Sequence, residues 1–430
     1  MSKRLSGLLF YCLMIFAVTA CTDSGGDVAP TPIPGDGAAG GDTPDDPSGG
    51  SGSGEYSVAE MLTAYVDEIV APNYAALVSS AQAMTDSEGE LHAYCDAIGT
   101  ENESVTHSIA QDQWRALASQ VQRAELHAIG PAAENAFSLQ YRLNSYMFGS
   151  LSTCGVDGIA ALVDENFDIA NRSINQRGIG ALEYLLFNET LEHSCPPQAS
   201  ATQSWNELSS GQRKSKRCEA ATLIAKDIAE AAEAIATRWD PSGGDFRAIF
   251  LAEDRLSESL QITTDGLFYI EEGAKDAKLG NPLGIIEACS SLTCPEQIES
   301  PFSRTSLRQI INNVKAFETI FVSNEATGFD AHIVSEGFPE VAQRFVDNLS
   351  ETLALAESID VSLSEQVQLV QTASDDAECA NAFANPDSPS DRFPTCTLYG
   401  LIKRVVDDLK IDFVTIVNVS VPGGSQADND

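Results

Sequence analysis

The sequence predicts an all-α protein made of two helical-bundle domains packed against each other. Apolar residues recur at three- and four-residue steps in several segments, as on the buried face of an amphipathic helix. Sustained alternation of apolar and polar residues, which would indicate strands, is scarce. A segment rich in Gly and Pro lies near the midpoint and divides the helical part into halves of similar length.

The clearest helical pattern lies between Arg217 and Trp239. Its apolar positions are Ala221, Ile224, Ile228, Ala231, Ile235 and Trp239. Similar patterns begin at Val58, Leu307 and Val341. The segment Asp240-Pro-Ser-Gly-Gly-Asp245 is a strong helix terminator, so we expect an N-terminal bundle over residues 56–240 and a C-terminal bundle over 241–422.

Residues 1–20 have the pattern of a lipoprotein signal peptide. Lys3 and Arg4 precede an apolar run that ends at Val18-Thr19-Ala20-Cys21, a lipobox. The run is shorter than the roughly 20 apolar residues of a transmembrane helix. We therefore expect cleavage before Cys21 and its lipidation; an ordinary signal peptide with a chance cysteine is the alternative. Because Thr22 and not aspartate follows Cys21, we expect the outer membrane, with the body facing the periplasm.

Residues 21–55 are rich in Gly, Pro, Ser and Asp and contain almost nothing to bury, which predicts a flexible acidic tether. We also expect a disordered tail over residues 423–430. The formal net charge of −38 argues against binding nucleic acid or an anionic lipid surface through electrostatics. It suits cationic partners, including metal ions, although acidity also simply keeps an exported protein soluble.

Eight of the ten cysteines remain after removal of Cys12 with the signal peptide and lipidation of Cys21. An even number in an oxidising compartment indicates disulfides, and no CxxC motif occurs. Because short loops cost the least entropy to close, neighbouring cysteines are expected to pair. The expected bonds are Cys95–Cys154, Cys195–Cys218, Cys289–Cys294 and Cys379–Cys396.

Several segments between about residues 56 and 421 are distinctive: Gln113–Ala118, Arg123–His127 with Gly130-Pro131, Arg177–Phe187, Asp276–Gly284, Glu299–Ser303 and Asp407–Phe413. In this order they resemble the imelysin-like family, also known as the imelysin peptidase family. The resemblance implies two helical domains with the functional site at their interface. It also implies a link to iron acquisition at the cell envelope, so iron or another metal ion is an expected ligand and iron-uptake components are expected partners.

The family was first classed as metallopeptidases on a Gly-x-His-x-x-Glu motif, which aligns here with Gly178, Gly180 and Glu183. The motif histidine is replaced by Gly180, which supplies no ligand atom, and no HExxH motif occurs. Zinc proteolysis is therefore poorly supported, and Glu183 remains only a weak candidate metal ligand.

Apolar residues surround Glu183, so we expect it to be buried, where an unpaired carboxylate would cost several kcal/mol. One interpretation is structural: an ion pair with Arg177, Arg115 or Arg123, or hydrogen bonds from helix-terminal amides. The other is functional: a ligand or proton acceptor that lines the cleft between the domains, together with Gly178 and Gly180.

Glu125 and His127 are further ligand-binding candidates. Residues two apart lie on different faces of a helix, so they could share an ion only if the helix ends near His127, which Gly130-Pro131 allows. In the structural alternative, Glu125 pairs with Arg123 or Arg177 and His127 lies on the surface.

Three functions follow. The first is a ligand-binding or accessory lipoprotein that holds an iron species between two bundles. The second is a hydrolase of the imelysin type, and the third is a structural envelope protein whose acidic body binds a partner protein. Metal dependence distinguishes the first two from the third, and turnover of a peptide distinguishes the second from the first.

Overall fold

The computed structural model describes residues 56–164, 166–322 and 327–426, and the regular structure of these residues is helical throughout. The all-α prediction is confirmed. The expected signal peptide (1–20), Cys21 and the tether (21–55) lie outside the described residues, as do residues 427–430 of the expected tail. Within the described part of the chain, no helix is both long and apolar enough to cross a membrane.

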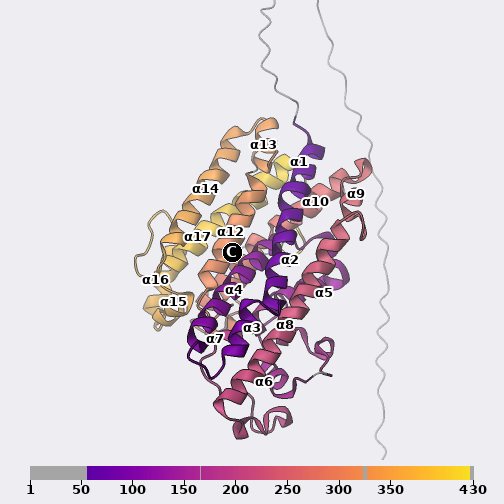
Figure 1. Ribbon diagram of the computed structural model, residues 1–430. Coiled ribbons are helices and arrows are strands. Elements are labelled where there is room, and N and C mark those ends of the chain that lie inside the picture. Colours follow the sequence, from indigo (N-terminus) through magenta and orange to yellow (C-terminus); the bar gives the residue numbers. More distant parts are fainter. Residues whose placement is uncertain (1–55, 165, 323–326, 427–430) are drawn as a thin grey trace, which may run out of the picture. The chain divides into compact units, whose positions relative to one another are not determined.

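The first half of the chain is built around the long helix α8, against which α2 and α7 pack (Figure 1). A π-helical turn, η1 (Tyr65–Val70), joins α1 to α2. The α-helices are α1 (Val58–Ala64), α2 (Ala71–Thr85), α3 (Glu90–Ala97), α4 (Glu103–Ala124), α5 (Glu134–Leu143), α6 (Thr153–Leu162), α7 (Gly178–Phe187) and α8 (Ser210–Trp239).

The second half is centred on α17, which packs against α14, α16 and the π-helical segment η10 (Ile270–Gly280). A second π-helical turn, η13 (Leu409–Phe413), follows α17. The α-helices are α9 (Phe246–Phe250), α10 (Leu256–Leu267), α11 (Asn281–Leu283), α12 (Ser306–Phe321), α13 (Phe329–Ser335), α14 (Pro339–Ser358), α15 (Leu363–Leu369), α16 (Ala373–Ala384), α17 (Pro394–Asp408) and α18 (Val414–Val417).

Helix α8 shows how the sequence sets its own limits. It begins at a capping box in which the side chains of Ser209 and Gln212 bond to each other's backbone amides. It ends at Trp239, directly before the terminator that begins at Asp240.

Helices of the two halves contact each other, since α4 packs against α12 and α1 against α10. The division into domains at residue 240 stays a prediction.

Four disulfides join the eight body cysteines. The bonds Cys289–Cys294 and Cys379–Cys396 are confirmed. The predicted Cys95–Cys154 and Cys195–Cys218 bonds are wrong. Cys95 is bonded to Cys218, with 5.7 Å between the Cα atoms, and Cys154 to Cys195, with 4.5 Å.

The packing of the helices explains this correction. Cys95 lies on α3 and Cys218 on α8, and these two helices contact each other. Cys154 lies in the first turn of α6, beside the segment that follows α7, where the Ser194 hydroxyl donates to Thr153 Oγ1 at 2.8 Å. Proximity in the fold, and not the shortest loop along the chain, therefore decides the pairing in this half.

Candidate functional site

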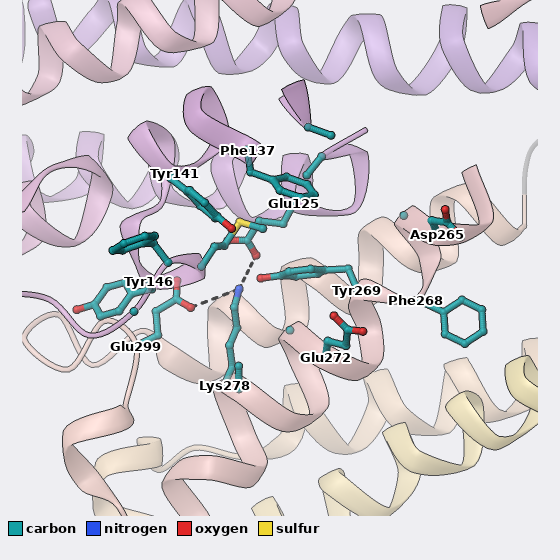
Figure 2. A pocket seen from close by; sticks show the side chains of 18 of the residues that line it. Glu125, Phe137, Tyr141, Tyr146, Asp265, Phe268, Tyr269, Glu272, Lys278 and Glu299 are labelled. Carbon is teal, nitrogen blue, oxygen red and sulfur yellow. Dashed lines mark hydrogen bonds and ion pairs between the residues drawn. The ribbon is translucent and has the colours of Figure 1, made fainter. Parts of the chain in front are cut away.

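A cavity of about 830 Å³ is lined by residues from both halves of the chain (Figure 2). The first half contributes residues between Glu125 and Ser150, and the second half contributes residues between Ile262 and Glu299. Pro422 completes the lining. The size is within the range of small-molecule sites in proteins. The cavity is therefore the first place to look for function.

Lys278, on η10, lies at the floor of the cavity between two glutamates (Figure 2). Its ammonium donates to Glu125 Oε2 at 2.5 Å and lies 3.4 Å from Glu299 Oε2. It also donates to Asn313 Oδ1 at 2.9 Å and to Gln122 Oε1. Four oxygen atoms thus surround the Lys278 ammonium. Because the ammonium has three protons, it cannot donate a separate hydrogen bond to each of them.

Three amide side chains complete this arrangement. Asn144 donates to Glu125 Oε1 at 2.6 Å and to Glu299 Oε1 at 2.9 Å. Gln122 donates to Glu299 Oε1 at 2.7 Å, and Asn313 donates to Glu125 Oε2 at 2.9 Å. We call these six residues the buried charge network: Gln122, Glu125, Asn144, Lys278, Glu299 and Asn313. Each is at most 5% exposed, and the network joins the two halves of the chain.

The network contains two carboxyl groups and one ammonium, so it carries an excess negative charge when both carboxyls are ionised. Burial raises the pKa of Glu299, and the nearby charge of Lys278 opposes that rise. Lys278 also lies over the ring of Tyr269, 5.5 Å from its centroid. Burial, followed by the charges of Glu125 and Glu299, raises the pKa of Tyr269 well above its ordinary value. The floor is therefore a place where further negative charge is unfavourable.

The backbone of η10 is π-helical over eleven residues. Such segments are rare and are frequent at functional sites. Glu272 and Lys278 line the cavity from this stretch, and Tyr269 lines it from the position directly before the stretch. Lys275 does not line the cavity; it is buried and pairs with Asp276 at 2.9 Å. Lys275 and Lys278 are thus only three residues apart but pair with different carboxylates, Asp276 and Glu125.

Aromatic side chains gather on another part of the lining, which we call the aromatic mouth: Phe137, Tyr141 and Phe148. The rings of Phe137 and Tyr141 are 5.9 Å apart, and those of Tyr141 and Phe148 are 5.5 Å apart. Phe148 is 59% exposed and Phe137 36%. The backbone of Asn135, Ala136 and Phe137 is left-handed, which costs roughly 1–2 kcal/mol per residue. Backbone strain of this kind gathers at binding sites.

The family motif lies on α7, behind one wall of the cavity. Gly178 begins the helix with φ +72°, and a Cβ atom there would lie 2.9 Å from the Leu143 carbonyl oxygen. Glu183 is fully buried, and its Oε1 accepts a hydrogen bond from the Ser303 amide at 2.7 Å. No hydrogen-bond partner of Oε2 is found among the described residues. Burial raises the pKa of Glu183 to about 8, against the Ser303 hydrogen bond, so it is largely protonated at neutral pH.

Tyr146 separates Glu183 from the cavity. Its ring packs on Gly180 so closely that a Cβ atom there would lie 2.5 Å from the ring. Tyr146 lines the cavity, and Glu183 does not. Burial, followed by the charges of Glu183 and Glu299, raises the pKa of Tyr146 well above its ordinary value. A phenol therefore occupies the space beside the position of the motif histidine.

The predicted ion pair of Glu183 with Arg177, Arg115 or Arg123 is not found among the described residues, and Arg123 is exposed. Arg177 donates from Nε to Asp227 Oδ2 at 2.8 Å, in a buried pair that Arg142 also joins at 2.7 Å. Arg115 is largely exposed and pairs with Asp112 at 2.5 Å. Of the structural interpretations, the one closest to the structure is a hydrogen bond from an amide near a helix start, because Ser303 lies in the turn before α12.

Glu125 and His127 face different surroundings, as their spacing predicts. The expected surface position of His127 is wrong, because it is buried with Nδ1 3.3 Å from the Tyr65 hydroxyl. Burial lowers the pKa of His127 to about 3, so the ring is neutral. The expected pairing of Glu125 with Arg123 or Arg177 is also wrong, because Lys278 is its partner. The chain turns into a 3₁₀ segment at Glu125–His127, which directs the two side chains apart.

Sequence reasoning missed Lys278, Glu299, Tyr146 and Asn144 as site residues. Lys278 and Glu299 lie inside two segments that resemble the family, Asp276–Gly284 and Glu299–Ser303, and that resemblance was the available signal. Tyr146 and Asn144 have no such signal. They reach the site because the 3₁₀ turn Ser145–Met147 follows α5 directly.

The motif positions do not fit a zinc ion. Gly180 offers no ligand atom, and one oxygen of Glu183 already accepts the Ser303 amide. Over residues 56–164, 166–322 and 327–426, no three His, Cys, Asp or Glu side chains gather as a metal site.

Comparison with known proteins identifies the fold and the family. Two solved structures resemble the chain: an imelysin-like protein from Psychrobacter arcticum 273-4, and a candidate iron-regulated protein A precursor from Parabacteroides distasonis ATCC 8503. The first has a TM-score of 0.58 at 18% identity and covers 85% of this chain and 96% of its own. The second has a TM-score of 0.55 at 16% identity and covers 81% of this chain and 94% of its own.

No curated protein matches the sequence. The family model described as "Peptidase_M75: Imelysin" matches residues 70–388, most of the chain, so this protein belongs to the imelysin family.

Proposed function

We propose that this protein is a lipid-anchored ligand-binding protein of the cell envelope, linked to iron uptake, with its binding site in the cavity between the two halves of the chain. The observation that supports this most is the cavity itself, whose floor is a buried charge network built from both halves. Groups that are buried and charged cost free energy to hold together, which natural sites accept for function.

The iron link rests on family membership and on the name of one structural neighbour, a candidate iron-regulated protein A precursor. The envelope location rests on the lipobox that ends at Cys21. A Cys21→Ser variant should leave the membrane fraction, because the lipobox then presents no thiol to acylate. Retention of the variant in membranes after a carbonate wash would contradict the lipid anchor.

Ligand binding can be tested by filling the cavity. Ala277 is exposed on η10 and lines the cavity, so Ala277→Trp places a large ring in the ligand's space without disturbing the core. Ala116→Trp on α4 is the matched control, because Ala116 is exposed and does not line the cavity. Each protein is titrated by calorimetry with ferrous sulfate, ferric citrate, haemin and ferrioxamine B.

We expect at least one of these iron species to bind the natural protein and Ala116→Trp, and to bind Ala277→Trp at least about tenfold more weakly, since a filled cavity excludes its ligand. Absence of binding by all four, or equal binding by Ala277→Trp, would refute the proposed site. The abundance of the protein in cells grown with and without iron tests the physiological link separately.

A further inference from the structure

The ionisable residues of the cavity lining are nearly all acidic. Lys278 is the one basic residue of the lining in the described part of the chain, against six acidic residues: Glu125, Glu134, Asp265, Glu272, Glu296 and Glu299. Of these, Glu134 pairs with Arg238 outside the lining. The other carboxylates give the cavity a negative potential, which concentrates cations and repels anions.

Lys278 cannot reverse this preference. Its ammonium already lies among oxygen atoms of Glu125, Glu299, Asn313 and Gln122. An anionic ligand would have to compete with two buried carboxyl groups for the same three protons. Among the described residues that line the cavity, no further cationic group is available for the carboxylates of citrate or haem, or for catecholate oxygens.

The aromatic mouth adds a second feature that suits cations. Phe137, Tyr141 and Phe148 present ring faces and edges at 5.5–5.9 Å spacing, and Phe148 is more than half exposed. Rings placed together in this way bind ammonium groups through their π faces and apolar chains through their surface. Tyr269, deeper in the cavity, already holds the Lys278 ammonium over its ring.

We propose that the cavity binds an organic cation with an apolar body, recognised by the aromatic mouth and by the acidic lining. This deepens the proposed function and rests on it: the iron species would be a chelate whose metal core has no net charge and which carries an ammonium arm. We do not expect anionic iron chelates or haem to bind, because the acidic lining repels their negative charge.

The sharpest test compares two ligands that differ in one charge. Ferrioxamine B is a ferric trihydroxamate with a free ammonium arm, and acetylation of its amine removes the positive charge and keeps the chelate. Full-length protein purified in detergent is titrated with both by calorimetry at low and high salt. We expect the acetylated form to bind about tenfold more weakly or worse, and salt to weaken only the charged form.

Variants then assign the recognition to named groups. Glu272→Gln, on the exposed part of the lining, should weaken ferrioxamine B several-fold and leave the acetylated form unchanged, whereas Glu60→Gln on α1 should change neither. Phe148→Leu keeps an apolar side chain and removes the ring, so it should also weaken the charged form more than the acetylated one. Phe338→Leu is its control, because Phe338 is 42% exposed away from the cavity.

Equal affinity for the two forms, or tighter binding of ferric citrate than of ferrioxamine B, would overturn the cation proposal and leave the proposed function standing. The failure of every iron species to bind would instead refute the proposed function. An unchanged ratio of the two affinities in Glu272→Gln and Phe148→Leu would remove these residues as the source of selectivity and overturn the mechanism of recognition proposed here.

Discussion

The floor of the cavity and helix α7 hold buried carboxyl groups in opposite ways. At the floor, Glu125 and Glu299 share an ammonium and three amide side chains. On α7, Glu183 accepts a hydrogen bond from the Ser303 amide at 2.7 Å, and burial raises its pKa to about 8, so that it is largely protonated near neutral pH. The first solution keeps charge inside the protein by surrounding it with partners, and the second removes the charge by keeping the proton.

This difference distinguishes the helix that carries the family motif from the residues that line the cavity. The motif helix lies behind Tyr146, while the cavity lining includes residues of α5, α10, η10, the 3₁₀ turn after α5 and the segment before α12. A motif that is recognisable in sequence thus locates the site to within one layer of side chains. The residues that line the cavity lie one layer further in.

The largest effect is expected from removing the counter-charge at the floor. Lys278→Met leaves Glu125 and Glu299 buried without their cation and should lower the free energy of unfolding by about 3–5 kcal/mol at neutral pH. Urea denaturation measures the loss. Lys226→Met is the control, because Lys226 is exposed and its ion pair with Glu230 is also exposed and long, at 4.0 Å. A loss below about 1 kcal/mol would show that the floor does not depend on this charge.

A smaller loss is expected at Gly180. A histidine there would collide with the Tyr146 ring, so Gly180→His should destabilise the protein by about 1–3 kcal/mol and gain no zinc affinity. The double variant with Tyr146→Ala opens the space and should bind zinc more tightly than either single variant. Thermal denaturation and zinc calorimetry measure both results. Tight zinc binding by the natural protein, lost in Glu183→Gln, would contradict our interpretation of α7.

The pH dependence of stability compares the two kinds of carboxyl directly. Because the pKa of Glu183 rises to about 8 on folding, the folded state holds a proton that the unfolded state releases above about pH 4.5. Its contribution to stability is therefore full below pH 4.5 and lost progressively as pH rises to about 8. Glu299 acts in the same direction, since burial also raises its pKa.

The variant Glu183→Gln resembles the protonated form. Its free energy of unfolding should fall less than that of the natural protein between pH 5 and 8, with Glu60→Gln as the unchanged control. Urea unfolding at several pH values gives both slopes. Parallel slopes for the natural protein and Glu183→Gln would mean that Glu183 is ionised in the folded state.

The smallest effect is expected at Arg115, which the sequence suggested as a partner of Glu183. Its guanidinium is exposed, pairs with Asp112 and lies 5.0 Å from the centre of the Phe187 ring. Arg115→Ala should change the free energy of unfolding by about 0.5 kcal/mol or less and leave ligand binding unchanged. A loss of binding in this variant would move the site toward the outer face of α4.

The sequence was sufficient for the helical class, because periodic apolar positions such as Ile224 and Ile228 report burial directly. It was also sufficient to predict that Glu183 is buried. It could not identify the partners of Glu183 or Glu125, because these come from Ser303 and Lys278, more than a hundred residues further along the chain. The spacing of residues along one helix predicts which of its faces is buried. It does not predict which helix, distant in the sequence, packs against that face.

The pairing of Cys95 with Cys218 encloses the pairing of Cys154 with Cys195, and this nesting has a consequence for the order of oxidation. A chain exported from its N-terminus presents Cys95, Cys154 and Cys195 before Cys218. Any bond that Cys95 forms before Cys218 follows is non-native, and the native bond is then reached only through thiol–disulfide exchange. For a chain exported as we propose, the yield of native protein should therefore fall without a disulfide isomerase, whereas the consecutive bonds Cys289–Cys294 and Cys379–Cys396 need only an oxidant.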